Sequence, residues 1–215
     1  ESKPIITNFL GVNTNAVVGE SLDQLYALPW QGLSSDDGSP LVVGKDGVLN
    51  KDYTGYLNSL TPDDLIRVGV SVAPYSGSMR NTLTYKAFQL SFNILMSAGH
   101  VFKKSSLNYQ DLLNNAKGHQ EFQERWQQAG DEMKSSVPSL PSSIIANRDL
   151  IYQSSQIHYQ SASHIRLHDI NIGYRLRDTK FNQRLGMESL SVMLNARDLG
   201  ILWKKANINV DPSYA

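Results

Sequence analysis

Residues 88–99 read Phe88-Gln-Leu-Ser-Phe-Asn-Ile-Leu-Met-Ser-Ala-Gly99, and apolar and polar side chains alternate along them with Leu95 as the one break. Alternation with a period of two over about eleven residues predicts a β-strand. About 9–11 tilted residues is also the length with which a strand crosses a bilayer. The expected apolar face carries Phe88, Leu90, Phe92, Ile94, Met96 and Ala98.

Two later segments repeat this alternation. Residues 189–197 place one set of side chains on an apolar face and leave Met193 as the exception; the apolar set is Leu190, Val192, Leu194 and Ala196. Residues 163–176 keep Ile165 and Ile170 on one face only if a β-bulge near His168 and Asp169 adds one residue. We also expect a shorter strand at 65–73, followed by a turn over 74–78 that leads into the strand at 88.

The connections between these strands are very unequal in length. Residues 177–186 form a short polar turn region, whereas residues 100–162 and 19–53 are long, and the first of these holds its own short helices. Outer-membrane barrels combine short turns on one side with long loops on the other. The sequence therefore predicts an all-β fold: antiparallel strands form part of a large transmembrane β-barrel, with long external loops that contain short helices.

Composition excludes several classes of protein. The 215 residues carry 20 basic and 20 acidic side chains, so the formal net charge is zero and a dominant nucleic-acid surface is not expected. The absence of Cys excludes disulfides, thiolate metal sites and a cysteine nucleophile. The sequence contains no run of about eighteen apolar residues, so no membrane-spanning helix is predicted.

Motifs follow one another in a set order along nearly the whole chain. The first two are Trp30-Gln-Gly-Leu-Ser-Ser-Asp-Asp-Gly-Ser-Pro40 and Pro74-Tyr-Ser-Gly-Ser-Met-Arg-Asn-Thr-Leu-Thr-Tyr-Lys-Ala-Phe-Gln-Leu-Ser91. The next are Arg125-Trp-Gln-Gln-Ala-Gly-Asp-Glu132, Ile165-Arg-Leu-His-Asp-Ile-Asn-Ile-Gly-Tyr174 and Asn195-Ala-Arg-Asp-Leu-Gly-Ile-Leu-Trp203. In this order they resemble the end of the SusC/RagA family of TonB-linked outer-membrane transporters. The chain departs from the family pattern at Leu83, where the family usually has Phe.

This resemblance implies a fold and a function. Residues 1–215 would form the C-terminal part of a TonB-dependent transporter barrel, about five of its roughly 22 strands, with the plug domain, most strands and the final strand lying outside this chain. The implied function is energy-coupled import of oligosaccharide or peptide across the bacterial outer membrane, without enzymatic activity or a cofactor. The implied partners are a SusD-like surface lipoprotein, outer-membrane lipid and, through the plug region, the TonB complex.

Two sets of residues follow from these expectations. Polar strand residues would face the lumen, namely Gln89, Ser91, Asn93, Arg166 and Asn195, whereas Phe88, Leu90, Phe92, Leu190, Val192 and Leu194 would meet lipid. Flat aromatic rings stack on sugars and anchor interfaces, and charged loop residues can accompany them. Candidate contacts to substrate or partner are therefore Trp30, Arg125, Trp126, Asp131 and Trp203. The aromatic residues have the alternative roles of loop packing or a girdle at the membrane edge.

The remaining reactive side chains indicate neither metal binding nor catalysis. His164 and His168 would lie roughly 13 Å apart on a strand, too far to share one ion, and His158 lies further upstream. The adjacent carboxylates Asp131 and Glu132 point apart, whereas glycoside hydrolysis needs two convergent carboxylates. The rival hypothesis is a soluble carbohydrate-binding or adhesion module, in which the apolar strand faces pack on each other as a β-sandwich.

Overall fold

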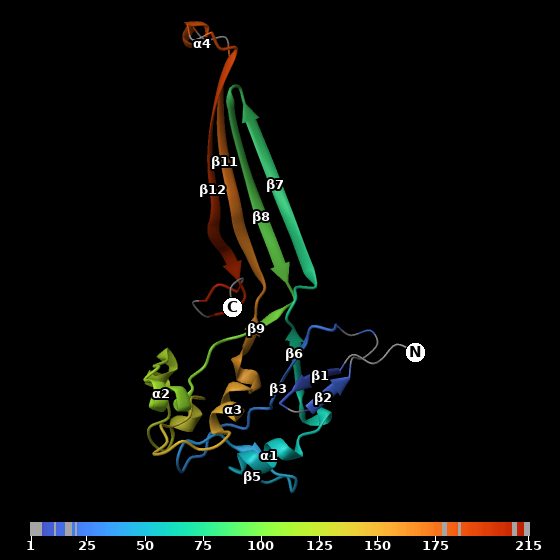
Figure 1. Cartoon of the computed structure of the whole chain (residues 1–215), viewed down its shortest axis with the longest axis vertical. Helices are drawn as coiled ribbons and strands as arrows, with labels where there is room; N and C mark the ends of the chain where they lie inside the picture. Colours follow the sequence, from blue (N-terminus) through green and yellow to red (C-terminus); the bar gives the residue numbers. More distant parts are fainter. Residues whose placement is uncertain are drawn as a thin grey trace. The chain divides into compact units, whose positions relative to one another are not determined.

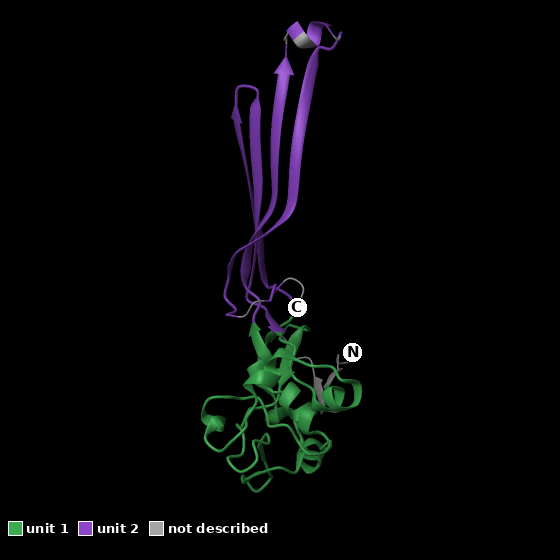
Figure 2. Cartoon of the chain, turned by 90° about the vertical axis from the view of Figure 1, so that its left-hand side faces the viewer, with its two compact units in different colours: residues 1–71, 103–160 green, residues 72–102, 161–215 purple. Residues whose placement is uncertain are grey.

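The computed structural model describes residues 6–10, 12–15, 19, 21–177, 180–184, 186–207 and 210–212. The chain forms two compact units (Figure 2). Unit 1 comprises residues 1–71 and 103–160, and unit 2 comprises residues 72–102 and 161–215. Within the described ranges, no helix has the length and apolar character needed to cross a membrane.

Unit 2 is built on one antiparallel sheet of four long strands in the order β12-β11-β8-β7 (Figure 1). The strands are β7 (Tyr75–Tyr85), β8 (Phe88–Ala98), β11 (His164–Arg177) and β12 (Ser189–Lys204). A short helix, α4 (Lys180–Arg184), lies in the connection between β11 and β12. The strand expected at residue 88 is confirmed.

The expected bulge lies at His168. Leu167 pairs with Ile94 of β8, and the next pair joins Asp169 to Asn93, so that His168 is the extra residue. A register shift at the same place occurs in the pairing of β11 with β12. The bulge therefore keeps Ile165, Leu167, Ile170 and Ile172 on one face of the sheet.

The prediction of a turn over residues 74–78 is wrong. Residues 75–85 are the strand β7, and the chain reverses at Lys86, whose φ of 53° is in the left-handed region. Pro, Ser and Gly suggested a turn, and Gly77 and Asn81 interrupt the apolar stripe. The sequence signal for this strand was the polar residue at every second position, namely Ser76, Ser78, Arg80, Thr82 and Thr84.

Two other strands differ from expectation. β12 does not end at residue 197 but continues to Lys204. Its pairing with β11 is irregular after Arg197, where Asp198 has a φ of 53°, and resumes at Gly200. The strand expected at 65–73 is the shorter β6 (Ile66–Val70), which pairs with β3 (Gln24–Ala27) in unit 1. The large sheet of the described residues therefore has four strands, where about five were expected.

Unit 1 is assembled from short elements. Its other paired strands are β1 (Ile6–Phe9) with β2 (Val12–Asn15), and β4 (Val42–Val43) with β5 (Leu49–Asn50). Its helices are α1 (Tyr53–Ser59), α2 (Tyr109–Asn115) and α3 (Arg148–Gln153), with the 3₁₀ turns η1 (Pro62–Asp64), η2 (Gln120–Glu124), η3 (Asp131–Met133) and η4 (Gln156–His158). The prediction that long connections contain short helices is confirmed. The short strand β9 (Val101–Lys103) pairs with β10 (Tyr159–Ser161).

Two small hydrophobic clusters hold unit 1 together. One contains Leu28, Val42, Tyr53, Leu65 and Ile151; the other contains Leu107, Tyr109, Val137 and Tyr152. Buried tyrosine hydroxyls tie each cluster to a loop: Tyr53 donates to the carbonyl of Pro40 at 2.9 Å, and Tyr109 to that of Pro138 at 2.6 Å. These bonds satisfy polar groups that would otherwise be costly to bury.

Candidate functional site

The sheet of unit 2 has one polar and one apolar face. Cross-strand partners share a face, and the pairings Asp169 with Asn93, Asn171 with Ser91 and Asn171 with Asn195 align the polar positions of three strands. The same register places all five residues expected to face the lumen on this face: Gln89, Ser91, Asn93, Arg166 and Asn195. Their assignment to a lumen stays a prediction.

A hydrogen-bonded ladder crosses the middle of the polar face. Asp169 accepts from the Arg80 guanidinium at 3.2 Å and from the Asn171 amide at 2.8 Å, and its carboxylate lies 3.0 Å from Nδ1 of His168. Asn171 in turn accepts a hydrogen bond from Asn195 of β12. The buried carboxylate is therefore paired with a cation and solvated by side chains from neighbouring strands.

Exposure depends on the strand as well as on the face. The edge strands β7 and β12 are largely exposed on both faces, with Leu83 59% and Leu194 66% exposed on the apolar face, whereas on the inner strand β8 the polar residues Ser91 and Asn93 are each 9% exposed. Burial of one Leu or Val side chain is worth roughly 1.5–3 kcal/mol. A row of such side chains left uncovered indicates that this face lies against something apolar.

Aromatic side chains mark both ends of the apolar face. Tyr75 and Trp203 lie at one end, where Trp203 pairs with Ile165; Tyr85, Phe88 and Tyr174 lie at the other. From Tyr75 to Tyr85 the strand runs roughly 33 Å at about 3.3 Å per residue. With a tilt of about 40° this corresponds to roughly 25 Å along a membrane normal, the height of the apolar band of outer-membrane barrels.

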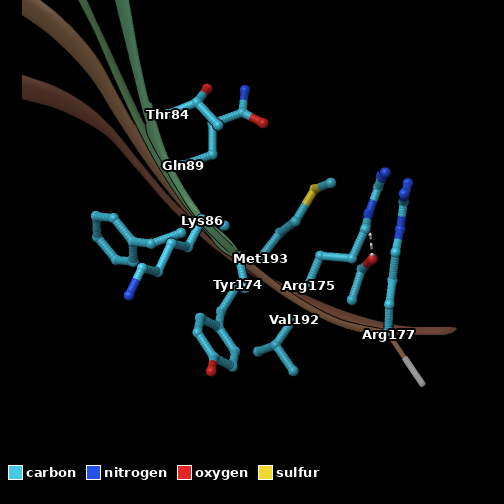
Figure 3. Close-up of a pocket in the computed structure, with 12 residues that line it drawn as sticks. Thr84, Lys86, Gln89, Tyr174, Arg175, Arg177, Val192 and Met193 are labelled. Carbon is cyan, nitrogen blue, oxygen red and sulfur yellow. Dashed lines mark hydrogen bonds between the residues drawn. The ribbon is translucent and has the colours of Figure 1, made fainter. Parts of the chain in front are cut away.

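A hollow of about 440 Å³ lies where the β7–β8 hairpin ends beside the longer strands β11 and β12 (Figure 3). Figure 3 shows Thr84, Gln89, Arg175 and Arg177 on one side of the sheet and Tyr174 and Val192 on the other. The other lining residues are Lys86, Ala87, Phe88, Gly173, Ser191 and Met193. Arg175 donates to the Ser191 hydroxyl at 3.2 Å, which orients its guanidinium.

In unit 1, the two tryptophans predicted to make contacts pack within the unit. Trp30 lies edge-on to Tyr152, with ring centroids 5.9 Å apart. Trp126 covers Gly38 and donates from Nε1 to the Glu132 carboxylate at 3.0 Å. Both rings are only partly buried, so each keeps an accessible surface for a ligand or a partner.

Arg125 and Asp131 line a second hollow of about 410 Å³, together with other charged and amide side chains such as Lys104, Gln123 and Lys134. The Arg125 guanidinium lies 4.1 Å from the centre of the Phe122 ring and donates to the Phe122 carbonyl at 2.9 Å. The Asp131 carboxylate accepts from two backbone N–H groups, both at 3.1 Å. The structure therefore brings these two predicted residues together, whereas Trp203 belongs to unit 2.

A buried polar cluster was missed by the sequence reasoning. Glu121 accepts three hydrogen bonds at 3.0 Å each, from Lys104, from the backbone N–H of Leu107 and from the Tyr152 hydroxyl. Burial alone would raise the pKa of Glu121, but these hydrogen bonds hold the pKa below its usual value. Burial and the Glu121 carboxylate raise the pKa of Tyr152. Residues 104–121 show no periodic pattern that would have indicated the cluster.

The three histidines considered as metal ligands are separated. His158 is fully buried in unit 1, where burial lowers its pKa to about 4, while His164 and the bulged His168 lie on β11 in unit 2. Among the described residues no three metal-ligating side chains lie close enough together to hold an ion.

Comparison with known proteins identifies the fold. No family model matches the chain, and no curated protein matches it. Among solved structures, the chain is similar to the RagAB peptide importer in its "open-open" state, with 18% identity and a TM-score of 0.56 over 89% of this chain and 22% of that chain. For the "closed-closed" state the identity is 18% and the TM-score 0.54, with the same coverage. For a further structure of the RagAB peptide transporter the values are 18% and 0.55, over 84% and 19%.

At this level of identity the likeness shows the fold and nothing finer. The chain is an all-β protein of antiparallel strands with a few short helices, and its fold is shared with part of the RagAB chains. It spans about a fifth of the length of the chains it matches. The predicted all-β fold of antiparallel strands with short helices in the long connections is confirmed.

Proposed function

We propose that this chain is a segment of an outer-membrane TonB-dependent nutrient importer, as the SusC/RagA resemblance implied. In this proposal the four strands of unit 2 cross the bilayer. Their polar face lines a wet lumen, and their apolar face meets lipid. Residues of unit 1 contribute to the vestibule through which cargo enters, and the chain carries out no enzymatic step.

The observation that carries this proposal is the uncovered apolar face of the sheet. Leu83 and Leu194 are 59% and 66% exposed, while Asp169 of the polar face is 5% exposed and paired with Arg80. Lipid is the environment in which an exposed apolar band is stable, and a lumen is the one in which a polar face is solvated. The aromatic rows at both ends of the band support the same assignment.

The edges of the sheet support a larger barrel. In the described part of the chain, β7 and β12 each pair with a neighbour on one side only. In lipid, unpaired N–H and C=O groups cost several kcal/mol each, so both edges need further strands. The similar RagAB chain is about five times as long as the region that matches, and a chain of that length could supply these further strands.

The proposed cargo and partner are inferred from the similar solved structures and from the SusC/RagA resemblance. The matched structures are described as a peptide importer, and we propose peptide or oligosaccharide as cargo here, with a SusD-like surface lipoprotein as partner. Trp30, Arg125, Trp126 and Asp131 are the proposed contact residues in unit 1. Trp203 instead fits a girdle at the membrane edge, because it shares the apolar face with Ile165.

The rival β-sandwich has less support. A sandwich buries the apolar faces of two sheets against each other. Among the described residues, Val192 and Leu194 are 60% and 66% exposed and no second sheet covers them.

Cysteine labelling tests the proposal, because the chain itself has no Cys. Single cysteines at positions 191–195 of β12, in the complete transporter, are treated with a membrane-impermeant maleimide. We expect labelling at Ser191→Cys and Asn195→Cys through the lumen, and protection at Val192→Cys and Leu194→Cys until the lipid is removed. Uniform labelling along the strand in intact membranes would overturn the proposal.

A further inference from the structure

The hollow at the hairpin end of the sheet is one-sided in charge. Among the described residues its lining includes no carboxylate and three cations, Arg175 and Arg177 on the polar side of the sheet and Lys86 on the side of Tyr174. All three side chains are exposed. A concave surface with one sign of charge concentrates ligands of the opposite sign.

Two other arginines of the polar face are paired with carboxylates. Arg80 is paired with Asp169, and Arg166 with Asp211. Within the described residues, no such ion pair involves a cation of the hollow. The arginines of the central ladder therefore serve the sheet itself, whereas the positive charge of the hollow is available to a ligand.

A neutral group orients one of the two arginines. The Ser191 hydroxyl accepts from Nε of Arg175 at 3.2 Å. This contact does not neutralise the charge, so it orients the guanidinium and leaves the charge available. A carboxylate suits such a site, because guanidinium groups bind carboxylates in a planar, bidentate geometry.

The direction of the arginines favours the lumen over the lipid surface. Arg175 and Arg177 project from the same side of the sheet as Gln89, opposite to Tyr174 and Val192 (Figure 3). A lipid headgroup would approach from the side of Tyr174. A solute that moves along the polar face would instead meet both guanidinium groups.

We propose that Arg175 and Arg177 form a cationic binding site at this end of the polar face, and that the site selects cargo that carries carboxylates. This inference rests on the proposed function, since it assigns a charge preference to the same lumen. Rings of Arg and Lys give anion preference to other membrane pores by the same physics.

Binding to the purified complete transporter tests the site. The probes are a short glutamate-rich peptide and its glutamine analogue of equal length, titrated by calorimetry at low and at high salt. We expect the Arg175→Gln/Arg177→Gln double variant to bind the glutamate peptide about fivefold to tenfold more weakly and to lose the preference over the glutamine analogue. The wild-type preference should also shrink at high salt.

Two variants separate charge from fold. Arg175→Lys/Arg177→Lys keeps the positive charge and should retain most of the preference, while Lys117→Gln removes an exposed cation of unit 1 and should change nothing. Equal binding of both peptides to the wild type, or an unchanged preference in the Gln variant, would overturn the inference. Displacement of the peptide by vesicles of phosphatidylglycerol would also overturn it, in favour of a lipid site. Uptake of the two peptides by cells is measured separately. Failure to import either peptide would contradict the proposed function, whereas the titration alone decides whether the binding site exists.

Discussion

His158 lies edge-on against Tyr152, with ring centroids 4.5 Å apart and ring planes at 88°. The His158 side chain is fully buried, and within the described part of the chain neither of its ring nitrogens has a hydrogen-bond partner. The Tyr152 hydroxyl donates to the Glu121 carboxylate. A neutral imidazole and a charged carboxylate are therefore linked through one tyrosine, and protonation of either group is expected to destabilise unit 1.

Unit 1 should lose stability in acid. Burial lowers the pKa of His158 from 6.5 to about 4, so the unfolded chain binds this proton at a higher pH than the folded chain does. The stabilisation is complete above pH 6.5 and is lost as the pH falls toward 4. We expect the free energy of unfolding to decrease by roughly 1.4 kcal/mol per pH unit in this window, as followed by fluorescence of Trp30 and Trp126.

A matched variant isolates the histidine. Phe in place of His158 keeps an aromatic ring against Tyr152 and loses no hydrogen bond, so His158→Phe should fold well at neutral pH. The slope between pH 6.5 and 4 should become nearly flat in this variant. A slope as steep as that of the wild type would show that other groups cause the acid sensitivity.

Removal of the Glu121 carboxylate should be strongly destabilising. Glu121→Ala leaves the Leu107 N–H, the Tyr152 hydroxyl and the Lys104 ammonium without their acceptor. Loss of one partner of such a buried ion pair costs about 3–5 kcal/mol, measurable by denaturant titration of unit 1 fluorescence. Glu124→Ala removes an exposed carboxylate from the same 3₁₀ turn and should cost less than about 0.5 kcal/mol. Equal losses in the two variants would contradict the role of Glu121.

Two glycines with similar backbone angles should respond differently to alanine. Gly38 has a φ of 65°, and a Cβ there would lie 2.4 Å from the Trp126 ring; Gly47 has a φ of 77° and nothing within 4 Å of a Cβ. Gly47→Ala should cost about 1 kcal/mol from the left-handed backbone alone. Gly38→Ala should cost about 1–3 kcal/mol more than Gly47→Ala, because Trp126 must move. Comparable unfolding midpoints for the two variants would show that the ring does not rest on Gly38.

The strands of unit 2 could be predicted because each face of the sheet carries mainly one type of side chain. Apolar and polar residues alternate in β8 and in the first part of β12, and the bulge at His168 was recognisable as a change of parity. β7 escaped prediction because Gly77 and Asn81 stand at positions of the apolar face. The continuation of β12 to Trp203 was missed because an irregularity at Asp198 interrupts the pattern.

Unit 1 could not be predicted in the same way. Its stability depends on contacts between residues far apart in sequence, such as Glu121 with Tyr152 and Trp126 with Gly38. No periodicity indicates which loops meet, so the sequence identified Trp30, Trp126, Arg125 and Asp131 by residue type alone. Their packing and the hollow beside them required the structure.

Adjacent positions on β12 give the sharpest test of the proposal that the apolar face meets lipid. Leu194 is on the apolar face and pairs with Ile172, whereas Asn195 is on the polar face and pairs with Asn171. An arginine facing lipid near the midplane costs about 2–4 kcal/mol, and one facing the lumen is tolerated. We therefore expect Leu194→Arg to lower the yield of folded barrel and its resistance to heat in detergent gels, while Asn195→Arg stays close to the wild type. The reverse order would mean that the faces are assigned the wrong way round, because residues one apart differ in face and hardly in depth.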